Sequence, residues 1–144
     1  MRDYQPIKNN PYILPHALYM QVVWLIRDYD RMREEYESSL EKSPAPHDGQ
    51  PRSGSNVDST QQKALTRVNL WTKIEAVDQA LNTVPEEYQQ GVWNNVVYRV
   101  RYPDDAEPRT YRRYKSKFIY MVAKICFGCK DVLLGKKISV IMIL

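Results

Sequence analysis

Apolar residues recur at steps of three and four along four stretches of this chain, and this spacing predicts four amphipathic helices. The stretches are residues 15–42, 59–82, 85–101 and 109–127. The first is close to a heptad repeat, with apolar side chains at Leu18, Val22, Leu25, Tyr29, Met32, Tyr36 and Leu40. The pattern therefore predicts an all-α fold that begins with one unusually long helix.

Residues 43–58 interrupt the pattern between the first two helices. The run from 43 to 57 contains three Pro, two Gly and three Ser, a composition that does not support a packed element. Ser59 and Gln62 have the spacing of a capping box and predict the start of the second helix. Because a flexible linker of this length lets the second helix fold back, we expect a long antiparallel helical hairpin followed by two shorter C-terminal helices.

Residues 1–128 are expected to form this single helical domain. Gly91 lies inside the third helix, where Gly costs about 1 kcal/mol relative to Ala, and it predicts a close helix crossing. Trp24 and Trp71 are expected in the core or at an interface. The apolar tail, residues 129–144, could pack on the domain, form an edge strand or remain an unpacked end, and its pattern does not select among these.

Composition narrows the class of protein. The apolar fraction of 43% and the three Trp exclude wholesale disorder. The N-terminus has no signal-peptide pattern, and no run approaches the about 18 apolar residues that a membrane span needs. Two Cys predict no disulfide framework. We therefore expect a cytoplasmic protein without a membrane contact.

Candidate catalytic and metal-binding groups are sparse. Cys126 and Cys129 form a C-x-x-C pair, but no strand precedes them and no His lies at zinc-finger spacing. Adjacent acids such as Glu34 and Glu35 fall on predicted helix surfaces rather than in a pocket. No nucleophile elbow, phosphate loop or zinc-protease motif occurs. The sequence thus predicts a protein that is not an enzyme and has no metal or cofactor.

The helix predicted at 109–127 carries most of the chain's excess positive charge. From Arg109 to Lys124 it holds six basic residues and no acid, while the whole chain has a net charge of +4. An apolar stripe through Tyr111, Tyr114, Phe118, Met121 or Val122, and Ile125 would anchor it. A solvated basic helix surface is the commoner meaning of such a run, and a DNA-binding helix is the alternative. The candidate nucleic-acid-binding residues that this pattern gives are Arg109, Arg112, Arg113, Lys115, Ser116 and Lys117.

The order of these parts resembles a known family. A long N-terminal helix and a linker are followed by Val57-Asp-Ser-Thr60, Ile74-Glu-Ala-Val-Asp-Gln-Ala-Leu81, Val84-Pro-Glu-Glu-Tyr88 and a helix beginning Arg109-Thr-Tyr-Arg-Arg-Tyr-Lys-Ser-Lys-Phe118. This arrangement is similar to the RinA/ArpU-type regulators of late transcription in phages of Gram-positive bacteria. Their C-terminal part is similar to sigma-factor region 4, and the resemblance implies that the last helix contacts the DNA major groove. The positions that the resemblance implies for this contact are Arg109, Thr110, Arg112, Arg113, Ser116 and Lys117.

One departure from region 4 concerns the helix-turn-helix. Region 4 has a complete helix between the Pro-Glu-Glu helix and the DNA-reading helix, whereas this chain has only the seven residues from Tyr102 to Pro108. Seven residues can form a turn but not a helix of two or three turns. The motif is therefore either reduced, with the 85–101 helix as its first member, or absent.

Two functional hypotheses follow. The first is a phage-type transcription regulator that binds double-stranded DNA. The second is a helical protein–protein interaction module, such as a phage-encoded adaptor or an inhibitor of a host protein, without nucleic-acid binding. In the first, the first two helices would form a hairpin for homodimerisation or for contact with RNA polymerase. In the second, the seam of the first helix from Leu18 to Leu40 and the apolar tail would contact another host protein. The candidate partner-binding residues are Leu18, Val22, Leu25, Tyr29, Met32 and Tyr36.

Overall fold

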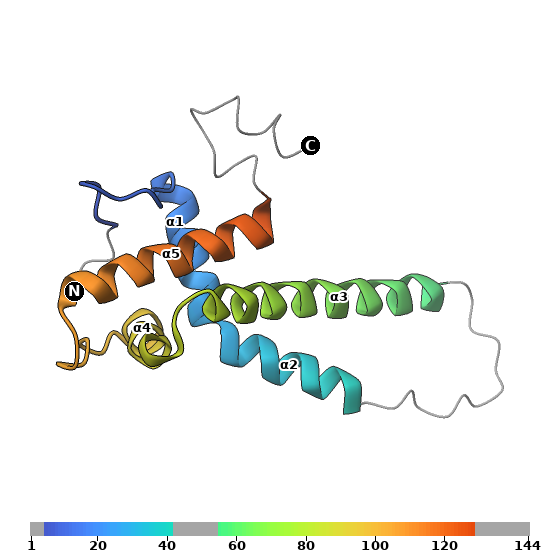
Figure 1. Ribbon diagram of the computed structural model, residues 1–144. Helices are drawn as coiled ribbons and strands as arrows, with labels where there is room; N and C mark the ends of the chain where they lie inside the picture. Colours follow the sequence, from blue (N-terminus) through green and yellow to red (C-terminus); the bar gives the residue numbers. More distant parts are fainter. Residues whose placement is uncertain (1–4, 42–54, 129–144) are drawn as a thin grey trace.

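The computed structural model describes residues 5–41 and 55–128, which fold into five α-helices (Figure 1). They are α1 (His16–Arg27), α2 (Tyr29–Glu41), α3 (Ser55–Asn82), α4 (Glu86–Tyr98) and α5 (Pro108–Phe127). The all-α prediction is confirmed, and so is the antiparallel hairpin followed by two C-terminal helices. The predictions for residues 43–54 and for the tail 129–144 lie outside the described residues, whereas 55–58, expected in the linker, already belong to α3.

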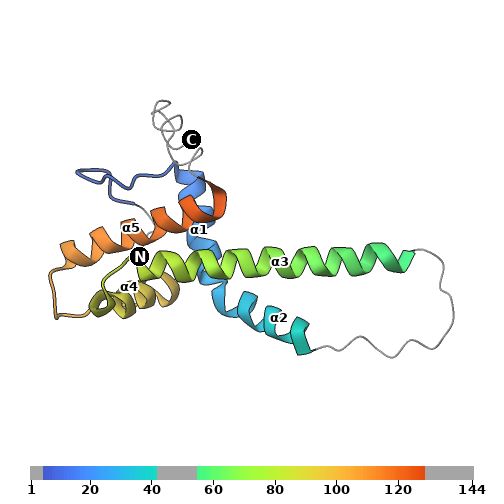
Figure 2. The ribbon, with the colours of Figure 1, turned by 45° about the vertical axis from the view of Figure 1, so that its right-hand side comes forward.

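The prediction of a single long helix at 15–42 is wrong, because the chain changes direction at Asp28. The Asp28 amide still donates to the carbonyls of Trp24 and Leu25, at 3.1 and 3.2 Å, and its φ and ψ are −86° and 1°. Its carboxylate accepts two hydrogen bonds from the Arg31 guanidinium, at 2.6 and 2.7 Å. The α2 helix starts at the next residue and runs at an angle to α1 (Figures 1 and 2).

The helices form a head and a projecting arm. The head consists of α1, α4, α5 and the C-terminal part of α3 from Thr72 to Asn82, and α5 contacts α1, α3 and α4. The arm consists of α2 and the first part of α3, from Ser55 to Trp71, which run side by side away from the head (Figures 1 and 2). Only α2, rather than the whole of 15–42, therefore supplies the first member of the hairpin.

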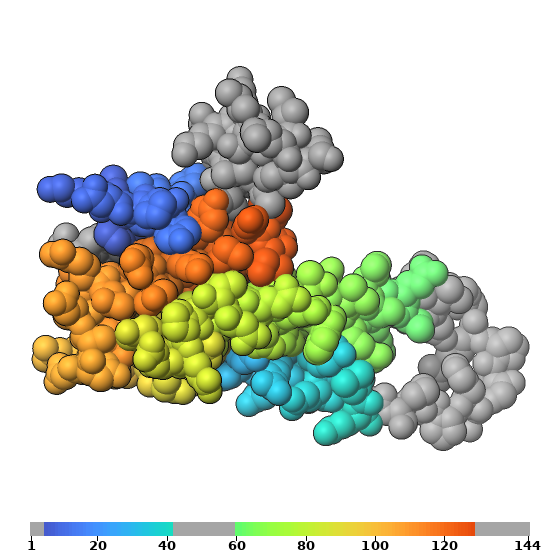
Figure 3. Space-filling model, in the orientation of Figure 1, coloured from blue at the N-terminus to red at the C-terminus, as the bar shows by residue number. Residues whose placement is uncertain are grey.

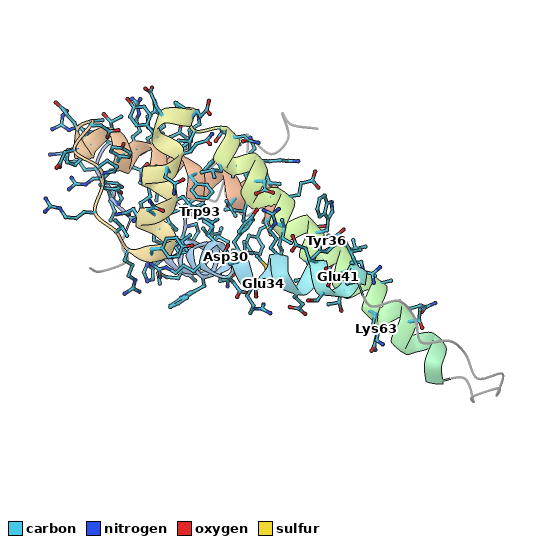
Figure 4. All side chains as sticks on the ribbon, turned by 90° about the horizontal axis from the view of Figure 1, so that it is seen from below. Asp30, Glu34, Tyr36, Glu41, Lys63 and Trp93 are labelled. Atoms are coloured by element: carbon cyan, nitrogen blue, oxygen red, sulfur yellow. The ribbon has the colours of Figure 1, made fainter. Side chains whose placement is uncertain are left out.

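The core lies where the helices of the head meet. Apolar side chains from α1, α3, α4 and α5 converge there with essentially no solvent exposure: Val22, Ile26, Val77, Val92, Val96, Phe118 and Val122. Trp93 of α4 packs edge-on against Tyr29 at 5.1 Å between ring centroids, and it stacks on Phe118 at 6.3 Å. These ring contacts join the start of the arm to the head, as the position of Trp93 in Figure 4 indicates.

The arm is less completely buried than the pattern predicts. Val68 and Trp71 belong to the apolar stripe expected on the second helix, yet they are 58% and 47% exposed. Trp24 is 57% exposed, so neither Trp24 nor Trp71 is a core residue of this chain. For Val68 and Trp71 the reason is that α3 extends past the head, where among the described helices it runs beside α2 (Figures 1 and 2), with the Tyr36 and Trp71 ring centroids 5.3 Å apart.

The segment before α1 packs on the head. Leu14 is 2% exposed, and the Gln5 side chain both accepts a hydrogen bond from the Leu14 amide, at 3.0 Å, and donates one to the Leu14 carbonyl. Tyr12 contacts Tyr120 of α5 at 5.4 Å between ring centroids. This segment lies along α5 in Figure 3. None of the described helices combines the length and apolar character of a bilayer span.

Candidate nucleic-acid interface

The basic helix α5 packs against the head through buried side chains on one face, most of them in its C-terminal half. It begins with Pro108 in the first turn, where the missing amide hydrogen costs nothing, and the Thr110 and Tyr111 amides donate to the Glu107 carbonyl. Its buried apolar residues are Tyr111, Phe118, Ile119, Val122 and Ala123. The stripe differs from the expected one, because Tyr114 is half-buried and Ile125 is 37% exposed.

The start of α5 is fixed against α4 by a cluster of tyrosines. The Tyr111 ring stacks on Tyr102 at 5.1 Å and meets the edge of Tyr88 at 5.3 Å. The Tyr111 hydroxyl donates to the Asp105 carboxylate at 2.6 Å. Burial, assisted by this hydrogen bond, raises the pKa of Tyr111 to about 12, so the hydroxyl keeps its proton at neutral pH.

Gly91 lies where α4 crosses this cluster, as the sequence predicts. A Cβ atom at position 91 would lie 2.6 Å from Cε1 of Tyr111 and 3.0 Å from Cδ of Pro103. Carbon atoms do not approach one another to 2.6 Å without a shift of one of them. The absence of a side chain at Gly91 therefore lets α4 and α5 approach closely.

The turn from 99 to 107 is held by a buried amide. Asn95 is 2% exposed, its Nδ2 donates to the Val100 carbonyl, and its Oδ1 accepts from Nζ of Lys115, both at 2.9 Å. Arg99 ends α4 in the left-handed conformation, with φ of 58°, and the Val100 amide donates to the Asn94 carbonyl. The turn contains no helix, and α4 is consequently the helix directly before α5 in the chain.

The predicted nucleic-acid-binding residues lie on more than one face of α5. Arg109, Arg112 and Arg113 are exposed, whereas Thr110, Lys115 and Lys117 are half-buried. Ser116 is only 7% exposed, which leaves little of its side chain available for the nucleic-acid contact predicted for it. The reason is that the buried stripe runs through Ile119 and Ala123, which turns Ser116 toward the interior.

Three of these cations form a single outer row. Arg109, Arg113 and Lys117 follow one another at four-residue steps, which places them on one side of a helix. Arg112 and Lys115 lie on another side, where they line a cavity with the turn. We call Arg109, Arg113 and Lys117 the outer row.

Positive charge extends from α5 into the turn before it. Residues 99–117 contain seven basic and three acidic residues, of which Arg99 and Arg101 lie outside the predicted set. Their basic character was readable in the sequence, but only the fold brings the turn beside α5. By contrast, α2 carries five acidic and two basic residues, and Figure 4 shows Asp30, Glu34 and Glu41 along it.

The candidate partner-binding seam is a core element of this chain. Val22, Tyr29 and Met32 are at most 8% exposed, because α1 and α2 turn this face toward the other helices. Leu18, Leu25 and Tyr36 are half-buried and pack against the same core. The prediction that this seam is a surface for a second protein is therefore wrong for the folded chain.

No site with the geometry of a metal centre is present within residues 5–41 and 55–128, where no three His, Cys, Asp or Glu side chains gather. Cys126 is half-buried, and burial raises the pKa of its thiol, while Cys129 lies outside the described residues. Comparison with family models, curated proteins and solved structures finds no match for this chain. The resemblance to phage late regulators stays a prediction.

Proposed function

We propose that this protein binds double-stranded DNA through the outer row of α5 and acts as a phage-type transcription regulator. The observation that carries the proposal is the position of Arg109, Arg113 and Lys117 on one side of a helix whose opposite side is anchored in the core. DNA-binding helices commonly present basic residues of their N-terminal half to the major groove in this way. The partial positive charge of the α5 N-terminus adds attraction for phosphate.

The packing of α4 against α5 supports a reduced helix-turn-helix. A DNA-reading helix needs a second helix that fixes its orientation, and here α4 contacts α5 through Gly91 and Tyr111. The buried Asn95 links α4, the turn and Lys115. We infer that α4 is the supporting member and α5 the member that contacts DNA. The role in transcription rests on the resemblance to late regulators.

A salt titration of DNA binding tests the proposal. If the outer row neutralises three phosphates, the logarithm of the association constant falls with the logarithm of salt concentration with a slope of about −3. Arg113→Gln should reduce the magnitude of that slope by about 1, and Arg109→Gln combined with Arg113→Gln by about 2. Fluorescence anisotropy with a labelled duplex measures both quantities.

A matched charge reversal serves as the control. Arg109→Glu with Arg113→Glu, and Lys63→Glu with Lys73→Glu, remove the same amount of positive charge, but both lysines are exposed residues of α3. Lys63 lies on the arm, away from α5 (Figure 4). The first pair should abolish DNA binding and the second should leave most of it. A slope near zero for the unmodified protein, or equal losses for the two pairs, would refute the proposal.

The second candidate function is a protein–protein interaction module, and one observation favours it. Large apolar side chains of the arm and its junction with the head are exposed: Trp24, Leu40, Leu65, Val68 and Trp71. Leu65, Val68 and Trp71 follow one another at three-residue steps on α3, and contiguous exposed apolar side chains are typical of interaction surfaces. If the arm binds a host protein, Val68→Glu with Trp71→Glu should abolish that complex, while Arg109→Glu with Arg113→Glu should leave it intact. The reverse pattern would contradict this candidate.

A further inference from the structure

A cavity lies behind the outer row, at the junction of the α4–α5 turn with α5 and α1. Its volume is about 560 Å³, within the range of small-molecule sites. Tyr19 of α1 and Tyr102 of the turn contribute aromatic walls, and Pro6 and Pro108 contribute apolar ones. The cavity is therefore larger than a single ion requires and has apolar surface for the rest of a ligand.

Positive charge gathers around this cavity. Arg101 of the turn and Arg112 and Lys115 of α5 all line it, and Asp104 is the only acid among the described residues that do so. Neither Arg101 nor Arg112 has a carboxylate within ion-pair distance in the described part of the chain. Two guanidinium groups that line one cavity without an ion-paired carboxylate repel one another, and a bound anion would relieve that repulsion.

Tyr102 adds a neutral hydrogen-bond donor. Burial raises its pKa to about 12, although the nearby charge of Arg112 opposes the rise. The hydroxyl therefore keeps its proton at neutral pH, and it has no hydrogen-bond partner among residues 5–41 and 55–128. Its ring is held by stacking on Tyr111, with 12° between the planes, so the donor has a fixed position. A fixed donor beside two guanidinium groups suits an oxyanion.

We propose that this cavity binds the phosphate group of a small phosphorylated molecule, with Arg101, Arg112 and Lys115 as the cationic partners. A phosphate monoester carries close to two negative charges at neutral pH, whereas each DNA phosphodiester carries one. Three cations around one cavity match the charge of a phosphate monoester better than the single charge of a phosphodiester. The apolar walls from Tyr19 and Pro108 would contact the remainder of the ligand.

The cavity and the outer row can be distinguished because they use different sides of α5. Arg112 and Arg113 are adjacent and chemically identical, but only Arg112 lines the cavity, while Arg113 lies over the Tyr114 ring at 5.1 Å. A ligand in the cavity would join Arg101 of the turn to Arg112 of α5. Its occupancy would thus stabilise the position of α5 whether or not α5 contacts DNA.

Isothermal titration calorimetry of the full chain with adenosine monophosphate, and separately with inorganic phosphate, tests the inference at constant ionic strength. Saturable binding of one equivalent is expected. Arg112→Gln and, independently, Arg101→Gln should each weaken binding at least about tenfold, because each removes a charge-assisted hydrogen bond. Arg113→Gln should change it less than about twofold. Tyr102→Phe, which keeps the ring, should weaken binding severalfold.

Absence of saturable binding of both probes would overturn the proposal, and so would equal losses for Arg112→Gln and Arg113→Gln, which would indicate diffuse charge. Because Arg101 lies in an exposed turn, its variant remains informative if Arg112→Gln fails to fold. A duplex whose binding depends on Arg101 while neither small probe binds would assign the cavity to a DNA phosphate and overturn the small-ligand proposal. Phosphate binding together with a zero salt slope for DNA would retain the cavity and reject only the proposed DNA function.

Discussion

Replacing Gly91 by Ala tests the helix crossing that positions α5. The new methyl group would lie 2.6 Å from Cε1 of Tyr111 and 3.0 Å from Cδ of Pro103. Tyr111 is completely buried, and it is held by stacking with Tyr102 and by its hydrogen bond to Asp105. The ring therefore cannot move away without breaking these contacts, and α4 and α5 must separate instead.

Two opposing effects set the size of the change in stability. In a helix interior, Ala is favoured over Gly by about 1 kcal/mol. Overpacking a well-filled site costs about 1–3 kcal/mol, and the fixed ring of Tyr111 favours the upper end. The net result should be a loss of about 2 kcal/mol in the free energy of unfolding. With a typical urea dependence this loss lowers the midpoint of unfolding by about 1 M.

Urea denaturation followed by circular dichroism measures the effect, and a double-mutant cycle assigns its cause. Tyr111→Leu removes the ring atoms nearest to position 91, so in that background Gly91→Ala should stabilise the protein by about 1 kcal/mol through helix propensity alone. The coupling free energy between the two sites is then about 3 kcal/mol. Gln90→Ala, at an exposed neighbouring position of α4, should change stability by less than about 0.5 kcal/mol.

One result would refute this reasoning directly. If Gly91→Ala is as stable as the unmodified protein or more stable, the crossing has room for a side chain and Tyr111 does not fix α5 against α4. A loss of stability that persists unchanged in the Tyr111→Leu background would also contradict it, because the clash would then lie elsewhere.

Two further predictions concern tyrosine hydroxyls. Tyr29→Phe should lower the free energy of unfolding by about 1 kcal/mol, because it removes a 2.7 Å hydrogen bond to Asp78 between α2 and α3; Tyr98→Phe, which removes a 3.2 Å surface bond to Asp30, should have less than half that effect in the same urea titration. The pKa of Tyr111 is raised from its ordinary value of 10.0 to about 12 in the folded chain. The contribution of the protonated hydroxyl to the free energy of unfolding is therefore fully present below pH 10.0 and is lost as the pH rises toward 12. From about pH 9 to about pH 11, the urea midpoint of unfolding should therefore fall less in Tyr111→Phe than in the unmodified protein. An equal fall in the two proteins would contradict this assignment.

The helices of the head were predictable from sequence because their apolar spacing reflects burial on one face. Phe118 and Val122 belong to the expected stripe and are completely buried. The break at Asp28 was not predictable in the same way, because no residue is inserted there and no Pro or Gly occurs. Val22, Tyr29 and Met32 therefore keep the spacing of a continuous helix on both sides of the bend.

The errors at the candidate site and in the arm have a common origin. An apolar stripe gives the direction of burial only to within about one residue step of 100° around the helix. A rotation of this size around the helix axis is enough to turn Ser116 from an exposed position to a buried one. The stripe also does not reveal whether a neighbouring helix is long enough to cover it, which is why Val68 and Trp71 remain exposed on α3.

The extension of α3 beyond the head divides one continuous helix into two environments. Ile74, Val77 and Ala80 are at most 3% exposed among other helices, whereas Leu65 and Val68 are more than half exposed. Backbone hydrogen bonds open locally where few buried contacts must be broken, and only with global unfolding where many must be. Amide hydrogens of α3 should therefore exchange with solvent faster near Leu65 than near Val77. A single unbroken helix thus contains a gradient of local stability, so the arm can open while the base beneath α5 stays closed.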